Sequence, residues 1–111
     1  MSVATATDIL APFEIWEILL DDSTIKFYEP LVLEPEILPP EEAGDPFYWT
    51  VDVPDLDISA VAINRSELIS CVRSDIRMIW DNCVRKDDRF LTPKNRIIKQ
   101  RYLSMAEEVD G

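Results

Sequence analysis

The chain gathers three aspartates within one short segment: Asp52, Asp55 and Asp57. Carboxylate oxygens are the hard ligands that Mg²⁺ and Ca²⁺ prefer, so this corner could hold a divalent cation and support hydrolysis. However, acids beside a proline turn are more often solvated turn residues, and no histidine, nucleophile or basic activator accompanies them. A metal-dependent hydrolase is therefore the least favoured of the three functions considered below, after a protein-binding domain and a nucleic-acid-binding regulator.

The rest of the sequence offers little that could catalyse a reaction. It contains no histidine, which is the commonest general base and metal ligand. Cys71 and Cys83 lack the spacing of a zinc site, and with only Gly44 and Gly111 the chain has no glycine-rich phosphate loop. We therefore expect a protein that is not an enzyme, with no catalytic residue, no metal and no cofactor.

Length and composition predict a single folded domain. The 111 residues are 47% hydrophobic and 30% charged, which suits one soluble core better than a disordered chain. No apolar run approaches the ~18 residues of a membrane span, and residues 1–11 lack the pattern of a secretory signal. Cys71 and Cys83 fall about 18 Å apart on one expected helix, too far to form a disulfide. Two unpaired thiols favour a reducing, cytoplasmic compartment.

Charge is distributed unevenly along the chain, whose net charge is −11. Residues 1–60 contain fourteen acidic residues against the single Lys26, whereas residues 61–111 contain eight acidic and ten basic residues. Seven of those cations fall between Arg85 and Arg101. The acidic half disfavours broad phosphate binding and favours a basic protein partner, although acidity also keeps a small domain soluble.

The first third of the chain predicts two strands after a loose leader at residues 1–11. Residues 13–22 (FEIWEILLDD) have no clean period, but aromatic and β-branched residues after Pro12 favour a strand over a helix. Residues 24–34 (TIKFYEPLVLE) predict the second strand. Pro30 predicts an edge position or a break within it, because proline cannot donate to a ladder.

A proline- and acid-rich segment precedes two further strands. Residues 35–46 hold four prolines and four acids, which predicts an exposed loop without regular structure. Residues 47–53 alternate clearly and predict a third strand with Trp49 on its buried face. Pro54 should end its pairing, and residues 56–63 resume as a fourth strand.

Two helices complete the expected fold. A capping box at Asn64–Glu67 begins a long amphipathic helix over residues 65–84. Thr92-Pro93 then begins a C-terminal helix over residues 93–108, and residues 107–111 should fray. The predicted class is α+β, a small antiparallel sheet of three to four strands with the long helix packed on one face and the second helix at the C-terminus.

The stretch YWTVDVPDLDISAVAINRSEL, residues 48–68, resembles the HicB-like antitoxin domain. That family's pattern is a strand that ends in an acidic or polar residue, an x-P-[DE]-L corner, a short strand and a capped helix. Val53-Pro54-Asp55-Leu56 matches the corner, and Asn64-Arg65-Ser66-Glu67-Leu68 matches the start of the helix. The resemblance covers residues 47–84. It implies one domain over residues 1–111 with a partial RNase H-like fold and no nuclease activity.

The resemblance also implies a partner. Members of the family typically bind a small, basic mRNA interferase and cover its active site, and many add a C-terminal DNA-binding element. We therefore expect a non-enzymatic, antitoxin-like interaction protein whose acidic surface neutralises a small basic toxin-like protein. The candidate contact residues are exposed acids near the corner and in the loop: Asp52, Asp55, Asp57, Glu41, Glu42 and Asp45.

Two alternatives stay open. In the first, the chain is an orphan HicB-like domain without a toxin. In the second, it is a nucleic-acid-binding regulator, a homodimer of the kind that small sheets with edge strands often form. The regulator would use cations of residues 85–101, which we call the basic segment: Arg85, Arg89, Lys94, Arg96, Lys99 and Arg101. Those cations could instead balance the chain's own acidic half, which we favour because their surplus is small.

Overall fold

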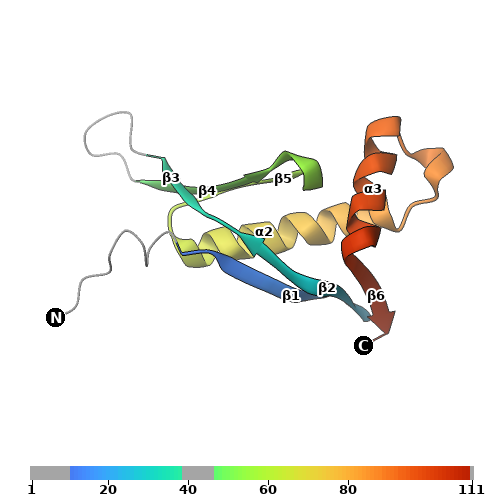
Figure 1. The fold of residues 1–111 in the computed structure, drawn as a ribbon, viewed down its shortest axis with the longest axis horizontal. Helices are drawn as coiled ribbons and strands as arrows, with labels where there is room; N and C mark the ends of the chain where they lie inside the picture. The colour runs from blue at the N-terminus through green and yellow to red at the C-terminus, as the bar shows by residue number, and fades with distance from the viewer. Residues whose placement is uncertain (1–10, 39–46, 111) are drawn as a thin grey trace.

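The computed structural model describes residues 11–38 and 47–110 (Figure 1). The described strands are β1 (Phe13–Leu19), β2 (Ser23–Leu33), β3 (Glu36–Leu38), β4 (Tyr48–Val53), β5 (Ile58–Ala62) and β6 (Ala106–Asp110). The helices are α2 (Arg65–Ile79) and α3 (Pro93–Met105), with short turns η1 (Pro54–Leu56), η2 (Trp80–Val84) and η3 (Asp88–Phe90). The predicted α+β class, with antiparallel strands, a long helix and a C-terminal helix, is confirmed.

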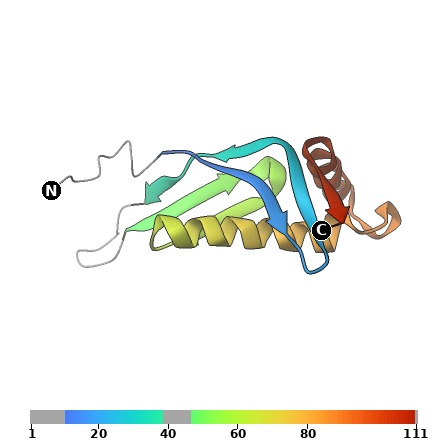
Figure 2. The same cartoon turned by 90° about the horizontal axis from the view of Figure 1, so that it is seen from below.

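The strands divide between two sheets of three rather than forming one. The middle strand of the first sheet, β1-β2-β6, is β2, and that of the second sheet, β3-β4-β5, is β4. Pro35 lies between β2 and β3, where the chain changes sheet, and it has no N–H to continue a ladder. Figure 2 shows α2 along one side of the molecule, with the strands of both sheets on the other.

One hydrophobic core lies between α2 and the two sheets. Leu68, Val72 and Ile76 recur along α2 at helical spacing and are all fully buried, as the amphipathic pattern predicts. Trp49, predicted to be buried, is partly buried and packs against this core. The sheets contribute the opposing apolar side chains: Phe13, Ile15, Ile18, Ile25, Phe27, Leu31, Leu33, Val51, Ile58, Ala60 and Ala62.

The pairing of β1 with β2 shifts register near its middle. Trp16 lies opposite a four-residue stretch of β2, residues 27–30. Pro30 falls within this stretch, but β2 runs unbroken from Ser23 to Leu33 and is the middle strand of its sheet. The predicted edge position or break at Pro30 is therefore wrong: the pairing with β1 is interrupted there, and the strand itself is not. The shift leaves Trp16 and Glu17 both exposed. Two consecutive outward residues remove the two-residue period from β1, which explains why its sequence did not distinguish strand from helix.

The C-terminal segment corrects two predictions. The helix ends at Met105 rather than at residue 108, and Ala106–Asp110 forms β6 instead of fraying. The new strand pairs antiparallel with the beginning of β2, from Ser23↔Asp110 to Phe27↔Ala106. Its acidic sequence carries no strand signal of its own, because the pairing depends on a neighbour that is distant in the sequence.

The proline- and acid-rich segment also contains regular structure, contrary to the prediction. Glu36–Leu38 forms β3, which pairs with the first half of β4. Pairing with β4 overrides the local preference of this segment for a loop. The predicted leader, apart from Ala11, lies outside the described residues, as does the segment 39–46. That segment holds three predicted contact residues: Glu41, Glu42 and Asp45.

Candidate functional site

The aspartate corner is the joint between the second sheet and α3. Asp57 follows η1 with φ of 58°, in the left-handed conformation that aspartate tolerates better than most residues. The Tyr102 hydroxyl donates a 2.7 Å hydrogen bond to the carbonyl of Leu56, and Nη1 of Arg101 donates a 3.0 Å bond to the carbonyl of Asp55. The corner therefore has a structural role, since its carbonyl groups anchor the C-terminal helix.

The three aspartates are exposed, but they do not form a metal site. Asp52 lies on β4 opposite Ser59, and the carboxylate of Asp55 lies 3.7 Å from Nη1 of Arg101. Among residues 11–38 and 47–110, no group of three or more acidic or cysteine side chains could hold a metal ion. Contact of Asp52, Asp55 and Asp57 with a protein partner stays a prediction.

Arg85, just after η2, ties the end of the long helix to the last strand. It donates hydrogen bonds to the carboxylate of Glu108, from Nε at 2.8 Å and from Nη2 at 2.7 Å. The same carboxylate accepts bonds from Nε1 of Trp80 at 2.7 Å and from Oγ of Ser23 at 2.9 Å. The bonds from Arg85 stabilise the charged carboxylate and lower the pKa of Glu108 to about 2. Sequence reasoning missed Glu108 because it assigned this end of the chain to a helix end and a frayed tail.

Other cations of the basic segment are also engaged within the fold. Nζ of Lys99 donates a 2.8 Å bond to the carboxylate of Asp88, which lowers the pKa of that carboxyl. Nε of Arg96 donates to the carbonyl of Asp88 at 2.9 Å. The guanidinium of Arg89 lies 4.8 Å from the ring centroid of Phe90. These contacts support the interpretation that the segment balances the chain's own acids.

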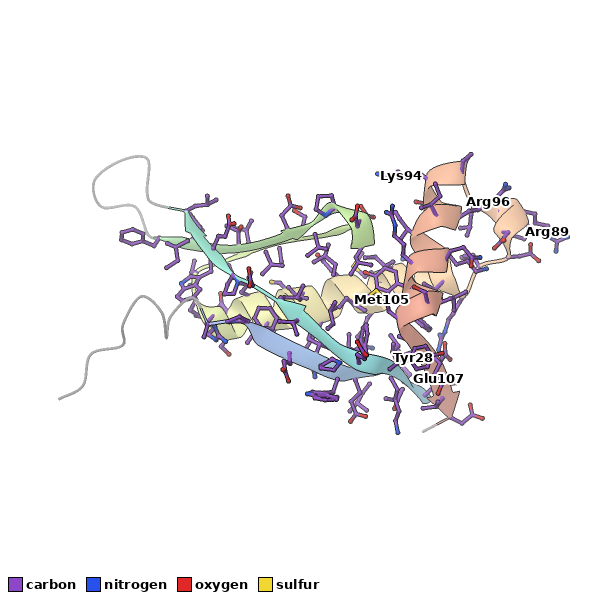
Figure 3. The ribbon with its side chains drawn as sticks, viewed as in Figure 1. Tyr28, Arg89, Lys94, Arg96, Met105 and Glu107 are labelled. Atoms are coloured by element: carbon purple, nitrogen blue, oxygen red, sulfur yellow. The ribbon has the colours of Figure 1, made fainter. Side chains whose placement is uncertain are left out.

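Three exposed cations of the segment, Arg89, Lys94 and Arg96, do not share one face. Figure 3 shows Lys94 on the side of α3 that is turned toward the second sheet, whereas Arg96 and Arg89 project from the opposite side. A nucleic-acid surface is expected to place its cations together, in a patch or stripe that follows the phosphates. Nucleic-acid binding by this segment therefore stays a prediction that the geometry does not favour.

Aromatic and acidic side chains share the outward surface of the first sheet, which we call the outer face. Trp16 and Tyr28 are 58% and 60% exposed there. Across the three strands, Glu17 of β1 lies opposite Lys26 of β2, which lies opposite Glu107 of β6. Large exposed aromatic residues anchor protein interfaces more often than they occur by chance on a free surface. The outer face consists of these residues with two neighbours: Glu14, Trp16, Glu17, Lys26, Tyr28, Val32 and Glu107.

Within residues 11–38 and 47–110, the acids of the outer face form no ion pair. In the described part of the chain, ion pairs engage acids elsewhere: Asp21, Asp22, Asp55, Asp81, Asp87, Asp88 and Glu108. Glu14, Glu17 and Glu107 are absent from these pairs, and Glu14 accepts only a 3.2 Å bond from Nε1 of Trp16. Lys26, which lies opposite Glu17 and Glu107, is the single cation among the outer-face residues, so this face has a surplus of negative charge.

A cleft of about 430 Å³ opens at one edge of the outer face. The pairing of β6 with β2 stops at Phe27, and beyond that point the end of α3 borders β2 instead. Figure 3 shows Tyr28, Met105 and Glu107 at this junction. The cleft is lined by Tyr28, Glu29, Pro30, Leu31, Val32, Ser104 and Met105.

A smaller cleft of about 190 Å³ places Cys83 near Asp57 and Asn95. The Cys83 thiol donates a 3.2 Å bond to the carbonyl of Asn95. Burial raises the pKa of this thiol above its ordinary value of 9.0. A reactive cysteine needs the opposite shift, so the cleft lacks the thiolate of a nucleophilic site.

No protein-family model matches the chain, and neither a curated protein nor a solved structure matches it. The resemblance to HicB-like antitoxins therefore stays a prediction from the motif at residues 47–84. The expected order of elements is present, because β4, η1, β5 and α2 follow one another. Asn64 caps α2 by accepting a 2.8 Å bond from the backbone N–H of Glu67. None of the described helices is long and apolar enough to cross a membrane.

Proposed function

We propose that this chain is a non-enzymatic binding protein whose outer face holds a small basic protein, in the manner of a HicB-type antitoxin. The observation that carries the proposal is the exposure of Trp16 and Tyr28 among carboxylates that have no ion-pair partner in the described chain. Exposed aromatic residues beside unpaired charge of one sign favour a partner of the opposite charge.

Charge and aromatic contact contribute to binding in different ways. Carboxylates such as Glu17 and Glu107 attract a cationic partner, which speeds the encounter and excludes acidic proteins. Trp16 and Tyr28 lose water when they are covered, and this desolvation supplies most of the affinity. Covering an aromatic residue on an already folded sheet also costs little conformational entropy.

The buried side of the first sheet and the hydrogen bonds of Arg85 hold the outer face in position. The opposite side of the sheet is buried against the core through residues such as Ile15 and Ile25. The hydrogen bonds between Arg85 and Glu108 fix β6 beside β2 and so position Glu107, the preceding residue in β6. Cys71 and Cys83 carry free thiols, which supports a reducing, cytoplasmic location for the complex.

Capture of a partner with two matched charge variants tests the proposal. Tagged wild-type protein is compared with an outer-face variant, Glu14→Gln/Glu17→Gln/Glu107→Gln, in lysate of the native host. The control is a corner variant, Asp52→Asn/Asp55→Asn/Asp57→Asn, which removes the same number of charges. We expect the wild type and the corner variant to retain a small basic protein that the outer-face variant loses.

The other outcomes are equally informative. Loss of the basic protein only by the corner variant would place the binding surface at Asp52, Asp55 and Asp57 and contradict the outer-face assignment. Recovery of no basic protein by the wild type would contradict the proposed function itself. Thermal unfolding of all three proteins shows whether each variant is folded during the capture.

A further inference from the structure

We propose that the cleft between β2 and the end of α3 receives one apolar side chain of the basic partner, flanked in the partner by lysine or arginine. This inference rests on the proposed function and names the chemistry of the segment that binds. Its basis is the interruption of the first sheet beyond Phe27, which pairs with Ala106, the first residue of β6 after the end of α3.

The cleft offers an apolar interior beside a polar rim. Leu31 is buried and Met105 is partly buried, and both line the cleft with Pro30. Its volume of about 430 Å³ accommodates one large side chain, and it falls within the ~300–1,000 Å³ of small-ligand pockets. An anchor side chain inserted into a preformed apolar pocket is the usual centre of an interface hot spot.

The charge around the cleft selects cations beside that anchor. Glu29 lines the cleft, is exposed and takes part in no ion pair of the described residues. Glu107 lies at the same junction in Figure 3 and likewise has no ion-pair partner in the described chain. Residues 1–60, which supply β2, contain only one basic residue, Lys26. Lysine or arginine on either side of the anchor would therefore find Glu29 and Glu107 as partners, with Lys26 as the one cation opposite Glu107.

A second copy of this chain is a poorer occupant of the cleft. Its strands would bring the same unpaired carboxylates against one another, and like charges at an interface are costly. Pro30 also lacks the N–H that a continuous ladder between two β2 strands would need. Recognition through an anchor side chain avoids this requirement, because it does not depend on an uninterrupted backbone ladder.

The cleft adjoins the outer face through shared residues. Tyr28 and Val32 belong to both surfaces. A partner that covers Trp16 can therefore extend one segment past Tyr28 and place an apolar side chain in the cleft. The outer face and the cleft would then be two parts of one binding surface, with separate contributions that substitutions can resolve.

Two peptides test the inference on the full-length chain. One is a pentapeptide with phenylalanine between two pairs of lysines, and the other has glycine in place of the phenylalanine. We expect the phenylalanine peptide to bind about tenfold more tightly in calorimetry, because its ring is buried. In NMR titration, its binding should shift the amide signals of the residues around the cleft that have an N–H: Tyr28, Glu29, Leu31, Val32, Ser104 and Met105.

Substitutions then locate the effect. Ser104→Trp fills the cleft from its exposed rim and should abolish the preference for the phenylalanine peptide. Ser74→Trp makes the same change on the exposed face of α2, away from the cleft, and should leave the preference intact. If Ser104→Trp proves unfolded by circular dichroism, Glu29→Lys replaces it and should weaken both peptides.

Three results would overturn the inference. Equal affinity for the two peptides would remove the anchor site, as would a preference that persists in folded Ser104→Trp protein. Binding of neither peptide would remove it as well. None of these results contradicts the proposed function, which fails only if no basic protein is captured or if capture does not depend on the outer face.

Discussion

Arg85 and Glu108 are joined by two hydrogen bonds, of 2.8 Å from Nε and 2.7 Å from Nη2 of the guanidinium. The pair connects the end of the long helix to the last strand. It takes the first cation of the basic segment into the fold and turns an acidic C-terminal sequence into a strand of the first sheet. Glu107 thereby reaches the outer face, where the proposed binding surface lies.

Protonation of Glu108 should weaken the fold at low pH. Hydrogen bonds from Arg85 lower the pKa of Glu108 from 4.5 to about 2, so its contribution is complete above pH 4.5 and is lost as pH falls through about 2. We expect Glu108→Gln to lower the free energy of unfolding by about 1–2 kcal/mol at neutral pH. Urea unfolding between pH 2 and 7 measures the difference, which should shrink toward pH 2. A difference that does not change with pH would contradict this role.

Removal of the Tyr102 hydroxyl should loosen the attachment of α3. The side chain is fully buried, its ring meets Trp80 edge-on at 6.4 Å, and its hydroxyl donates to the carbonyl of Leu56. Tyr102→Phe leaves that carbonyl without its donor and should cost about 1–2 kcal/mol in the free energy of unfolding. Tyr48→Phe, on an exposed side chain, is the matched control and should have almost no effect. Equal effects of the two substitutions in urea unfolding would show that the bond does not stabilise the joint.

Substitution of Trp80 should destabilise the fold, whereas substitution of Trp16 should leave its stability almost unchanged. Trp80 is 2% exposed, and Trp80→Ala should destabilise the fold by about 3–5 kcal/mol because it leaves a cavity in the core. Trp16 projects from the outer face, so Trp16→Ala should change the free energy of unfolding by no more than about 0.5 kcal/mol. Thermal and urea unfolding measure both values. A comparable loss from Trp16→Ala would mean that its ring supports the fold.

The two thiols should react at different rates with a disulfide reagent. Cys83 is buried and its pKa is raised by burial, whereas Cys71 is partly accessible. We expect the thiol of Cys71 to react quickly in the native protein and to release one equivalent of the reagent's chromophore. The thiol of Cys83 should react only on unfolding. Cys71→Ser should remove the fast phase, and Cys83→Ser should leave it. A fast phase that disappears in Cys83→Ser would reverse the assignment.

The sequence predicted elements whose signals are local. The helix after Asn64 has a cap and an apolar stripe of its own, and both are present in α2. The start of α3 at Thr92-Pro93 was predicted for the same reason, and Thr92 accepts a bond from the N–H of Asn95 at 3.2 Å. These elements could be predicted because caps and apolar stripes depend only on neighbours within a few residues.

The elements that the sequence missed depend on distant neighbours. The last strand has the sequence AEEVD, which becomes a strand only because β2 offers an edge and Arg85 binds Glu108. The division into two sheets depends likewise on which strand pairs with β3. For the candidate binding surface, the sequence indicated only that residues 1–60 are acidic. It did not indicate on which face of its strand Trp16 lies, because the register shift removes the two-residue period from β1.

Calorimetry of the captured basic partner with wild-type and Trp16→Ala protein tests the central claim most directly. Val61→Ala, on an exposed side chain of the second sheet, is the control. We expect Trp16→Ala to weaken binding at least about tenfold, with unchanged thermal stability, while Val61→Ala leaves affinity as it is. Wild-type affinity in folded Trp16→Ala protein would show that the partner binds elsewhere and would contradict the assignment of the outer face.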